Sequence, residues 1–175
     1  MGIPGYKYLR SYQITVVIFD LTMEFVKRWI DYKSRTKDQM EQAARSGKQN
    51  IVEGYLEKSS KLYINLLSVA YASLGELLED YEDFLRLRGL ALWPGEDPRV
   101  RGFREFRVFR EPPDPPNAPK LPENPEEAAN LLITLIHQAQ FLLSRQGAAL
   151  EEKFVKEGGY TEKLFKKRLE ERRKR

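Results

Sequence analysis

The sequence predicts an all-α protein, an up-down four-helix bundle with a Pro-rich insertion between its third and fourth helices and a basic C-terminal helix or tail. From about residue 11 to 88, apolar residues recur at three- and four-residue spacing without a proline. Nine of the ten prolines lie between Pro94 and Pro125, where they interrupt helix. The expected parts are residues 1–88 for the first three helices, 89–124 for the insertion, 125–160 for the fourth helix and 161–175 for the basic tail.

The first helix is expected over residues 12–32. Apolar residues at helical spacing predict one buried stripe, formed by Val16, Phe19, Met23, Val26 and Ile30.

The second helix is expected to start at Thr36, because Thr36-Lys37-Asp38-Gln39 has the pattern of a capping box. Its buried face combines apolar and small residues, namely Met40, Ala43, Ala44, Gly47, Ile51 and, at the edge, Tyr55. The small side chains predict that another helix approaches closely.

Ser59 or Ser60 is expected to cap a third helix over residues 61–87, about 27 residues and therefore about 40 Å long. Its apolar stripe consists of Leu62, Leu66, Ala70, Leu74, Leu77, Tyr81 and Leu85.

The fourth helix has a clear start, since Asn124 can cap it, Pro125 suits its first position and two acids follow in the first turn. It is expected to run to about residue 157 and to end at Gly158-Gly159, after which Thr161 would cap the basic segment. Its stripe consists of Ala128, Leu131, Leu132, Leu135, Ile136, Ala139, Leu142 and Leu143.

The composition excludes several classes of protein. The absence of cysteine excludes a disulfide scaffold, a thiolate zinc site and thiol catalysis. No apolar run approaches the roughly 18 residues of a membrane span, and the N-terminus lacks a signal-peptide cleavage site. We expect a soluble, cytoplasmic protein with no membrane partner.

No pattern of catalytic or metal-binding residues stands out. The single histidine, His137, follows Thr134 where a di-metal bundle would need a Glu-x-x-His pair, so we favour a structural or exposed histidine over a ligand or general base. The acids Glu76, Glu79, Asp80, Glu82 and Asp83 are interpreted as a solvated or ion-paired face, the alternative being a hard-cation site. No phosphate loop, HExxH or GxSxG motif occurs. We expect no cofactor, no metal and no enzymatic activity.

The net charge of +4 is distributed unevenly. Residues 161–175 carry eight basic and three acidic groups, so the rest of the chain has a net charge of −1. Residues 76–85 carry five acidic and no basic groups.

Three basic groups of residues suggest contact with nucleic acid: three cations of the expected second helix (Lys37, Arg45 and Lys48), the segment 99–110, and the C-terminal tail. Residues 99–110 interleave five arginines with Phe103, Phe106 and Phe109, a combination that holds phosphates while stacking bases; alternatively, the phenylalanines fold back and the arginines are only solvated. The tail would contact a polyanion in a salt-sensitive way, or only solubilise the chain. The candidate residues are Lys37, Arg45, Lys48, Arg101, Arg104, Arg107, Arg110, Lys166, Lys167, Arg168, Arg172 and Arg173.

Two segments carry a family resemblance. The segments are RTKDQMEQAARSGKQNIVEG at 35–54 and VAYASLGELLEDYEDFLR at 69–86. They resemble the four-helix-bundle proteins related to the 23S rRNA intervening-sequence protein. Within this family, the motif DQMEQAARSGKQNIVEG looks like that of the branch with a C-terminal four-helix-bundle suffix domain. The resemblance covers residues 10–90, and the chain beyond Gly89 corresponds loosely to the suffix region.

The resemblance implies an up-down bundle that assembles as a ring, typically a homopentamer, without known catalytic activity. Relatives include the accessory variability proteins of diversity-generating retroelements, whose basic rings bind nucleic acid and a reverse transcriptase. The implied partners are therefore further copies of the chain, RNA or DNA, and a reverse transcriptase or another nucleic-acid enzyme. The insertion at 86–124 departs from shorter family members, which turn quickly into the fourth helix.

Matched residue by residue, the resemblance marks two sets of positions, for which we expect structural or oligomer-forming roles. The sets are Gln39, Ala43, Ala44, Ser46, Asn50, Ile51, Glu53 and Gly54 in the second helix, and Ala70, Ser73, Leu74, Glu76 and Leu77 in the third. Ser46, Asn50 and Glu53 would form a buried polar network that fixes the helix register.

The sequence thus favours a non-enzymatic, homo-oligomeric helical bundle that binds nucleic acid or a nucleic-acid-processing partner. The alternative is an assembly scaffold whose acidic and basic patches meet between subunits. An enzyme built on His137 and the carboxylates of the third helix is a more distant third hypothesis.

Overall fold

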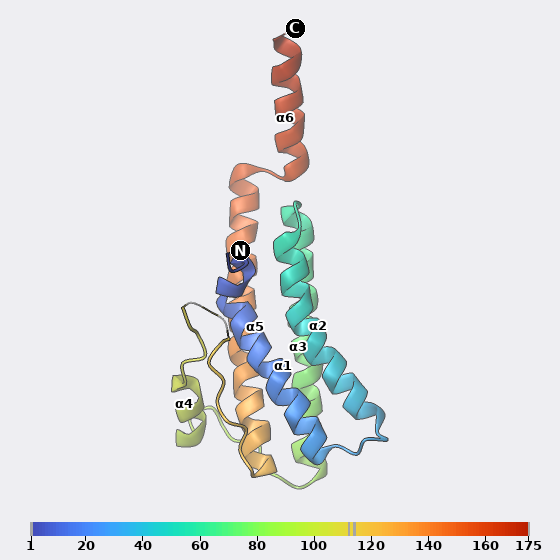
Figure 1. Cartoon of the computed structure of the whole chain (residues 1–175), viewed down its shortest axis with the longest axis vertical. Helices are drawn as coiled ribbons and strands as arrows, with labels where there is room; N and C mark the ends of the chain where they lie inside the picture. The colour runs from blue at the N-terminus through green and yellow to red at the C-terminus, as the bar shows by residue number, and fades with distance from the viewer. Residues whose placement is uncertain (1, 112, 114, 175) are drawn as a thin grey trace.

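The computed structural model describes residues 2–111, 113 and 115–174, and this part of the chain is helical without a strand (Figure 1). Its elements are the 3-10 helix η1 (Gly5–Tyr8) and the α-helices α1 (Arg10–Trp29), α2 (Arg35–Leu56), α3 (Ser60–Leu87), α4 (Pro98–Glu105), α5 (Pro125–Glu157) and α6 (Tyr160–Arg173). The expectation of an all-α protein is confirmed.

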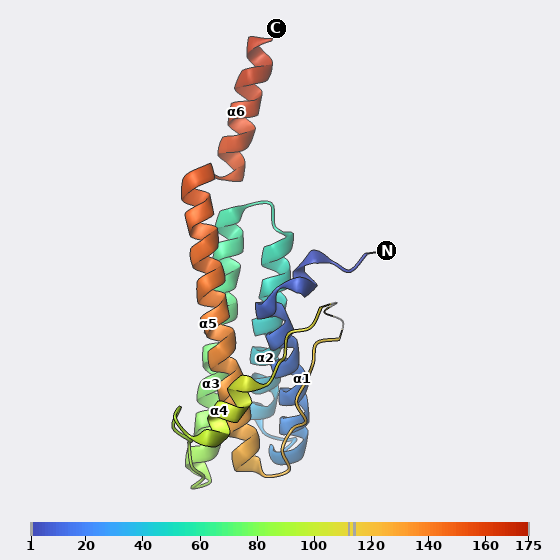
Figure 2. The same cartoon turned by 90° about the vertical axis from the view of Figure 1, so that its left-hand side faces the viewer.

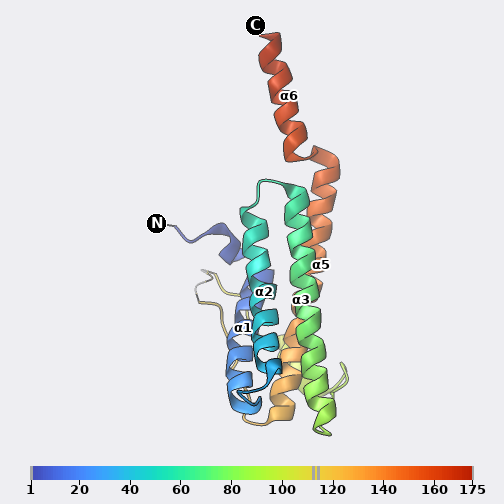
Figure 3. The same ribbon diagram turned by 90° about the vertical axis from the view of Figure 1, so that its right-hand side faces the viewer.

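The four long helices α1, α2, α3 and α5 lie side by side. Helix α1 packs against α2 and α5, and α3 packs against the same two neighbours from the other side. Along the chain these helices alternate in direction (Figures 1 and 3). Each helix therefore buries one face in a shared apolar core.

Helix α1 buries a different face from the predicted one. Its core residues are Ile14, Val17, Ile18, Leu21, Phe25 and Val26, of which only Val26 was expected. The expected core residue Met23 is 38% exposed, and Val16 and Phe19 are half-buried. Residues 14–19 are apolar except for Thr15, so two stripes compete in the sequence, and packing against α2 and α5 selects between them.

The predicted capping box at Thr36 is wrong, since α2 begins at Arg35. The cap is Ser34, whose hydroxyl accepts a hydrogen bond from the Thr36 N–H at 3.2 Å. The preceding chain already turns at Asp31, whose carboxylate accepts from the Lys33 N–H at 2.9 Å. Ser59 caps α3 and Asn124 caps α5, as predicted.

The small residues of α2 allow α3 to approach closely. A Cβ atom on Gly47 would lie 2.8 Å from the Leu74 side chain, and one on Gly54 would lie 2.6 Å from the Tyr63 ring. Two expected core residues, Tyr55 and Leu62, are instead exposed, although the Tyr55 ring still contacts that of Tyr63 on α3.

Helix α5 is enclosed on more than one side over its N-terminal half. All nine residues from 128 to 136 are buried, although a helix packed on one side would bury only a stripe. The insertion supplies the additional cover, with Trp93, Val100, Val108 and Leu121 buried. Figure 2 shows α4 lying across α5. The described residues of segment 89–124 thus form a layer on α5.

Helix α6 extends beyond the other helices (Figures 1 to 3). Gly158, at φ 75°, ends α5, and α6 starts after Gly159 without a side-chain cap, so the cap predicted at Thr161 is wrong. Every described residue of α6 is exposed. None of the helices in the described part of the chain combines the length and apolar character that a membrane span requires.

Candidate nucleic-acid interface

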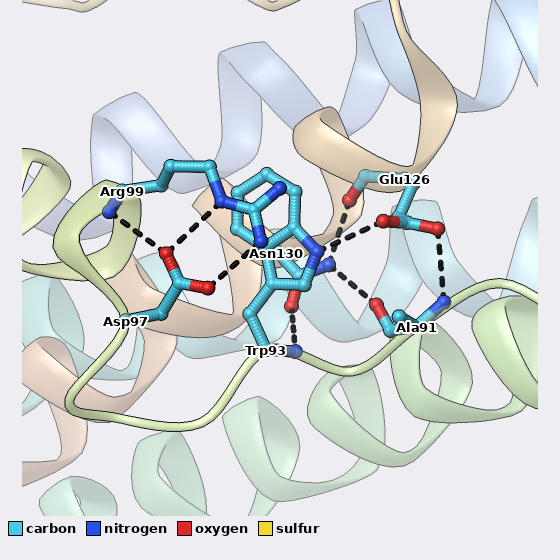
Figure 4. Close-up of polar contacts among 6 residues, drawn as sticks. All are labelled: Ala91, Trp93, Asp97, Arg99, Glu126 and Asn130. Atoms are coloured by element: carbon cyan, nitrogen blue, oxygen red, sulfur yellow. Dashed lines mark hydrogen bonds and ion pairs between the residues drawn. The ribbon is translucent and has the colours of Figure 1, made fainter.

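The insertion is attached to α5 by two polar side chains (Figure 4). The Glu126 carboxylate accepts hydrogen bonds from the Ala91 N–H and the Trp93 indole N–H, both at 2.9 Å. The Asn130 amide accepts from the Trp93 N–H at 2.8 Å and donates to the Ala91 carbonyl at 2.9 Å. These bonds satisfy the extended backbone before α4 and hold the Trp93 ring against α5. They also lower the pKa of Glu126, chiefly through the Ala91 and Trp93 donors.

Trp93 contacts two side chains of α4. The Arg99 guanidinium lies 3.4 Å from the indole centroid, and the Phe103 ring stacks with it at 6.2 Å and 15°. Asp97 fixes Arg99 through bonds of 3.0 Å to Nε and 2.7 Å to Nη2, and these bonds lower the pKa of Asp97 to about 2. Arg99 and Phe103 are therefore structural parts of the insertion.

A second attachment joins the end of the arginine- and phenylalanine-rich segment 99–110 to α1. The Arg110 N–H donates to the buried Gln13 side chain at 2.9 Å, and the Gln13 amide donates to the carbonyls of Arg110 and Lys7. The Asn117 N–H donates to the Val108 carbonyl at 3.0 Å, which folds the segment back on itself. The basic segment is thus fixed at both ends.

The arginines and phenylalanines of this segment do not share one role. Arg101, Arg104, Arg107 and Arg110 are exposed and form no ion pair with the described residues. Phe103 packs against the core, as expected if the phenylalanines fold back, whereas Phe106 and Phe109 remain partly exposed. The Arg10 guanidinium lies 5.1 Å from the centroid of the Phe109 ring. The segment therefore combines exposed aromatic surface with free positive charge.

The cations of α2 lie elsewhere. Lys37 pairs with Glu41 at 2.7 Å, and Lys48 lies 4.1 Å above the Phe19 ring. Arg45 is exposed. Figure 1 places α2 and α4 on opposite sides of the molecule, so the structure does not bring the two predicted groups together.

The basic residues of α6 form a third, separate group. Lys166, Lys167, Arg168, Arg172 and Arg173 are exposed and form no ion pair with the described residues. The neighbouring Lys163 pairs with Glu157 at 3.2 Å, and Lys174 approaches Glu171 at 3.9 Å.

The residues assigned structural roles divide into buried and exposed ones. The Asn50 amide donates to the Ser46 carbonyl at 2.9 Å, and the Ser46 hydroxyl lies 2.8 Å from that of Ser73. Ala43, Ala44, Gly54 and Ala70 pack in the core region. Glu53 is exposed and takes no part in the polar network, which corrects that expectation. Gln39 and Glu76 are also exposed, so they have no packing role inside the chain.

His137 is exposed and lines a cavity between the insertion and α5, together with Arg104 and Trp93. Within the described ranges, no three His, Asp or Glu side chains gather as a metal-binding group. Sequence reasoning missed Gln13, Trp93, Glu126 and Asn130. One signal was available, because Asn130 is a polar residue within an otherwise apolar helical run.

A scan of the chain against protein-family models gave no match, and neither the search of curated proteins nor that of solved structures found a similar one.

Proposed function

We propose that the chain is a non-enzymatic, homo-oligomeric protein whose helices α1, α2, α3 and α5 form an up-down four-helix bundle, with the segment 89–124 as an insertion. In this proposal the protein binds nucleic acid, or a partner that processes nucleic acid, through its basic segments. The observation that carries the proposal is α6, which presents five exposed cations without ion pairs to the described residues and buries none of its side chains.

The geometry of α6 suits a polyanion better than a packing role. A helix whose side chains all face solvent gains little from the hydrophobic effect. Its cations would release counterions when they contact phosphates, which favours binding at low salt. The exposed Arg107 and Arg110 offer further phosphate contacts along the insertion.

Fluorescence anisotropy with a labelled single-stranded RNA tests this function. If five cations contact phosphates, the affinity falls by roughly a hundred-fold between about 50 and 200 mM salt. Replacing Lys166, Lys167, Arg168, Arg172 and Arg173 with glutamine removes most of this salt dependence. The matched control replaces five exposed lysines outside α6 with glutamine, namely Lys27, Lys33, Lys58, Lys61 and Lys153. Binding that is absent, or insensitive to salt, contradicts the proposal.

The arrangement of charge favours one second candidate, the assembly scaffold. The acidic stretch 76–83 lies toward the C-terminal end of α3, whereas α6 projects from the opposite end of the molecule (Figure 3). The two cannot meet within one chain. Burial raises the pKa of Asp80, and the nearby Asp83 and Glu76 raise it further. A second copy's cations would relieve this repulsion, so dissociation of a nucleic-acid-free oligomer by salt favours the scaffold.

A further inference from the structure

The cavity beside α5 is large enough for a ligand. Its volume is about 620 Å³, within the roughly 300–1,000 Å³ that is common for ligand pockets. It lies between the insertion, α3 and α5. Much of its wall is apolar, formed by Leu92, Trp93, Val100, Phe109, Ile133 and Phe141.

Some of this wall is open to solvent. Phe141 is 61% exposed, Leu92 is 52% exposed and Phe109 is 38% exposed. The Trp93 ring, in contrast, is covered by Arg99 and Phe103, so it closes the cavity without offering a free face. The aromatic surface available to an entering group is therefore that of Phe141 and Phe109. The guanidinium groups near these rings lie farther away, Arg145 at 5.9 Å from Phe141 and Arg10 at 5.1 Å from Phe109.

The polar groups of the cavity include both signs of charge. Arg104 contributes a guanidinium that forms no ion pair with the described residues, and Glu82 contributes a carboxylate. His137 and Gln138 add an imidazole and an amide, the latter donating only a long bond of 3.4 Å to the Arg104 carbonyl. Asn130 and Thr134 are already hydrogen-bonded to the backbone.

The two opposite charges in the cavity favour an uncharged, planar ring whose edge carries both hydrogen-bond donors and acceptors. Glu82 opposes an anionic group and Arg104 opposes a cationic one, since unpaired like charges are costly at close range. A planar ring that carries both donors and acceptors would satisfy both residues and stack on phenylalanine. Nucleobases have this chemistry, and in single strands their edges are free.

We propose that the cavity binds one unpaired nucleobase of a single-stranded nucleic acid. The base stacks on Phe141, the most exposed aromatic ring of the cavity wall, and its edge bonds to Arg104, Gln138, His137 or Glu82. The adjoining phosphates contact Arg107 and Arg110, which follow Phe106 and Phe109 along the insertion. This inference rests on the proposed function, to which it adds a preference for single strands.

The first test needs no polyanion binding. In a Trp29→Phe background Trp93 is the only tryptophan, and its fluorescence reports on the cavity wall. We expect adenosine, cytidine, guanosine or uridine to change this fluorescence saturably. Phe141→Ala should abolish the change, whereas Tyr32→Ala, at an exposed aromatic residue outside the cavity, should leave it intact. If no nucleoside gives a saturable change, the inference is overturned.

The second test separates this inference from the proposed function. Stacking of a base on an aromatic ring contributes about 1–3 kcal/mol, so Phe141→Ala should weaken single-strand binding by about five-fold or more. Its affinity for a duplex of the same length should not change. Arg104→Gln should act in the same direction, with Lys27→Gln, at an exposed cation of α1 outside the cavity, as control. Equal losses for single strand and duplex refute the base pocket but leave general binding intact. Nucleoside binding without any polyanion binding refutes the proposed function and reduces the inference to a nucleoside pocket.

Discussion

The attachment of the insertion to α5 depends on a few polar side chains. One of them, Glu126, is ionisable, so the attachment depends on pH. Its folded-state pKa is lowered from 4.5 because the carboxylate accepts bonds from the Ala91 N–H and the Trp93 indole. A lowered pKa means that the stabilisation is present above the unfolded-state pKa and is lost as the pH falls through the folded-state pKa. We expect the insertion to stay attached at and above pH 4.5 and to loosen from α5 as the pH falls below it.

Trp93 fluorescence in the Trp29→Phe background measures this release. Glu126→Gln, which removes the ionisable group, should abolish the transition, whereas the neighbouring Glu127→Gln should retain it. Asp97, with a pKa of about 2, titrates at lower pH and accounts for a separate step there. A transition of equal size in the Glu126→Gln protein would show that another acid controls the insertion.

At the level of residues, the sequence was informative where the interaction is local. Asn124 and Ser59 cap helices by bonding to backbone a few residues away, so neighbouring residues were enough to predict them. Gln13 bonds to Arg110, 97 positions away, and Asn130 bonds to Trp93, 37 positions away. Such bonds depend on the route of the chain, which no local pattern encodes.

At the level of elements, the long helices were predictable because each repeats an apolar pattern over many residues. The limits of α5 were predicted from Asn124, Pro125 and the glycine pair, and the structure agrees. The buried face of α1 was not predictable, because an apolar run offers two stripes and only the neighbouring helices select one. For segment 89–124 the inward packing of phenylalanines was foreseen as one alternative, whereas the bonds of Trp93 to Glu126 and Asn130 were not, since they come from far along the chain.

Helix α6 is the element whose removal should cost least. Deleting residues 161–175 removes no described buried side chain, so the free energy of unfolding should change by less than about 0.5 kcal/mol, as for exposed substitutions. Urea denaturation followed by circular dichroism measures this change. The matched deletion of residues 2–9, which removes η1 and its contacts with α1 and α2, should be more costly. A large loss of stability on deleting α6 would show that it packs against a partner copy.

For the molecule as a whole, self-association is the prediction with the widest consequence. Helix α3 presents Leu62 and Val69 on one exposed face, seven residues apart and therefore two turns along the helix. Contiguous exposed apolar surface marks contact sites between proteins, and we expect Leu62 and Val69 to contribute to such a surface between copies. If copies of the chain associate through α3, a charge at Val69, which is 46% exposed, would be buried unpaired in the interface.

We therefore expect Val69→Glu to reduce the mass measured by light scattering from a multiple of 20.5 kDa to 20.5 kDa, while the helical circular dichroism signal is retained. Met23→Glu is the matched control, because Met23 is also exposed but lies on a different helix, α1. The control should keep the mass of the unaltered protein. Copies that associate head-to-tail form a closed ring only if the rotation between neighbours adds up to a full turn; otherwise they form open chains. A ring gives a mass that is a fixed multiple of 20.5 kDa, whereas open chains give a mass that grows with protein concentration. A mass of 20.5 kDa for the unaltered protein at every concentration would refute self-association, and with it the oligomeric part of the proposed function.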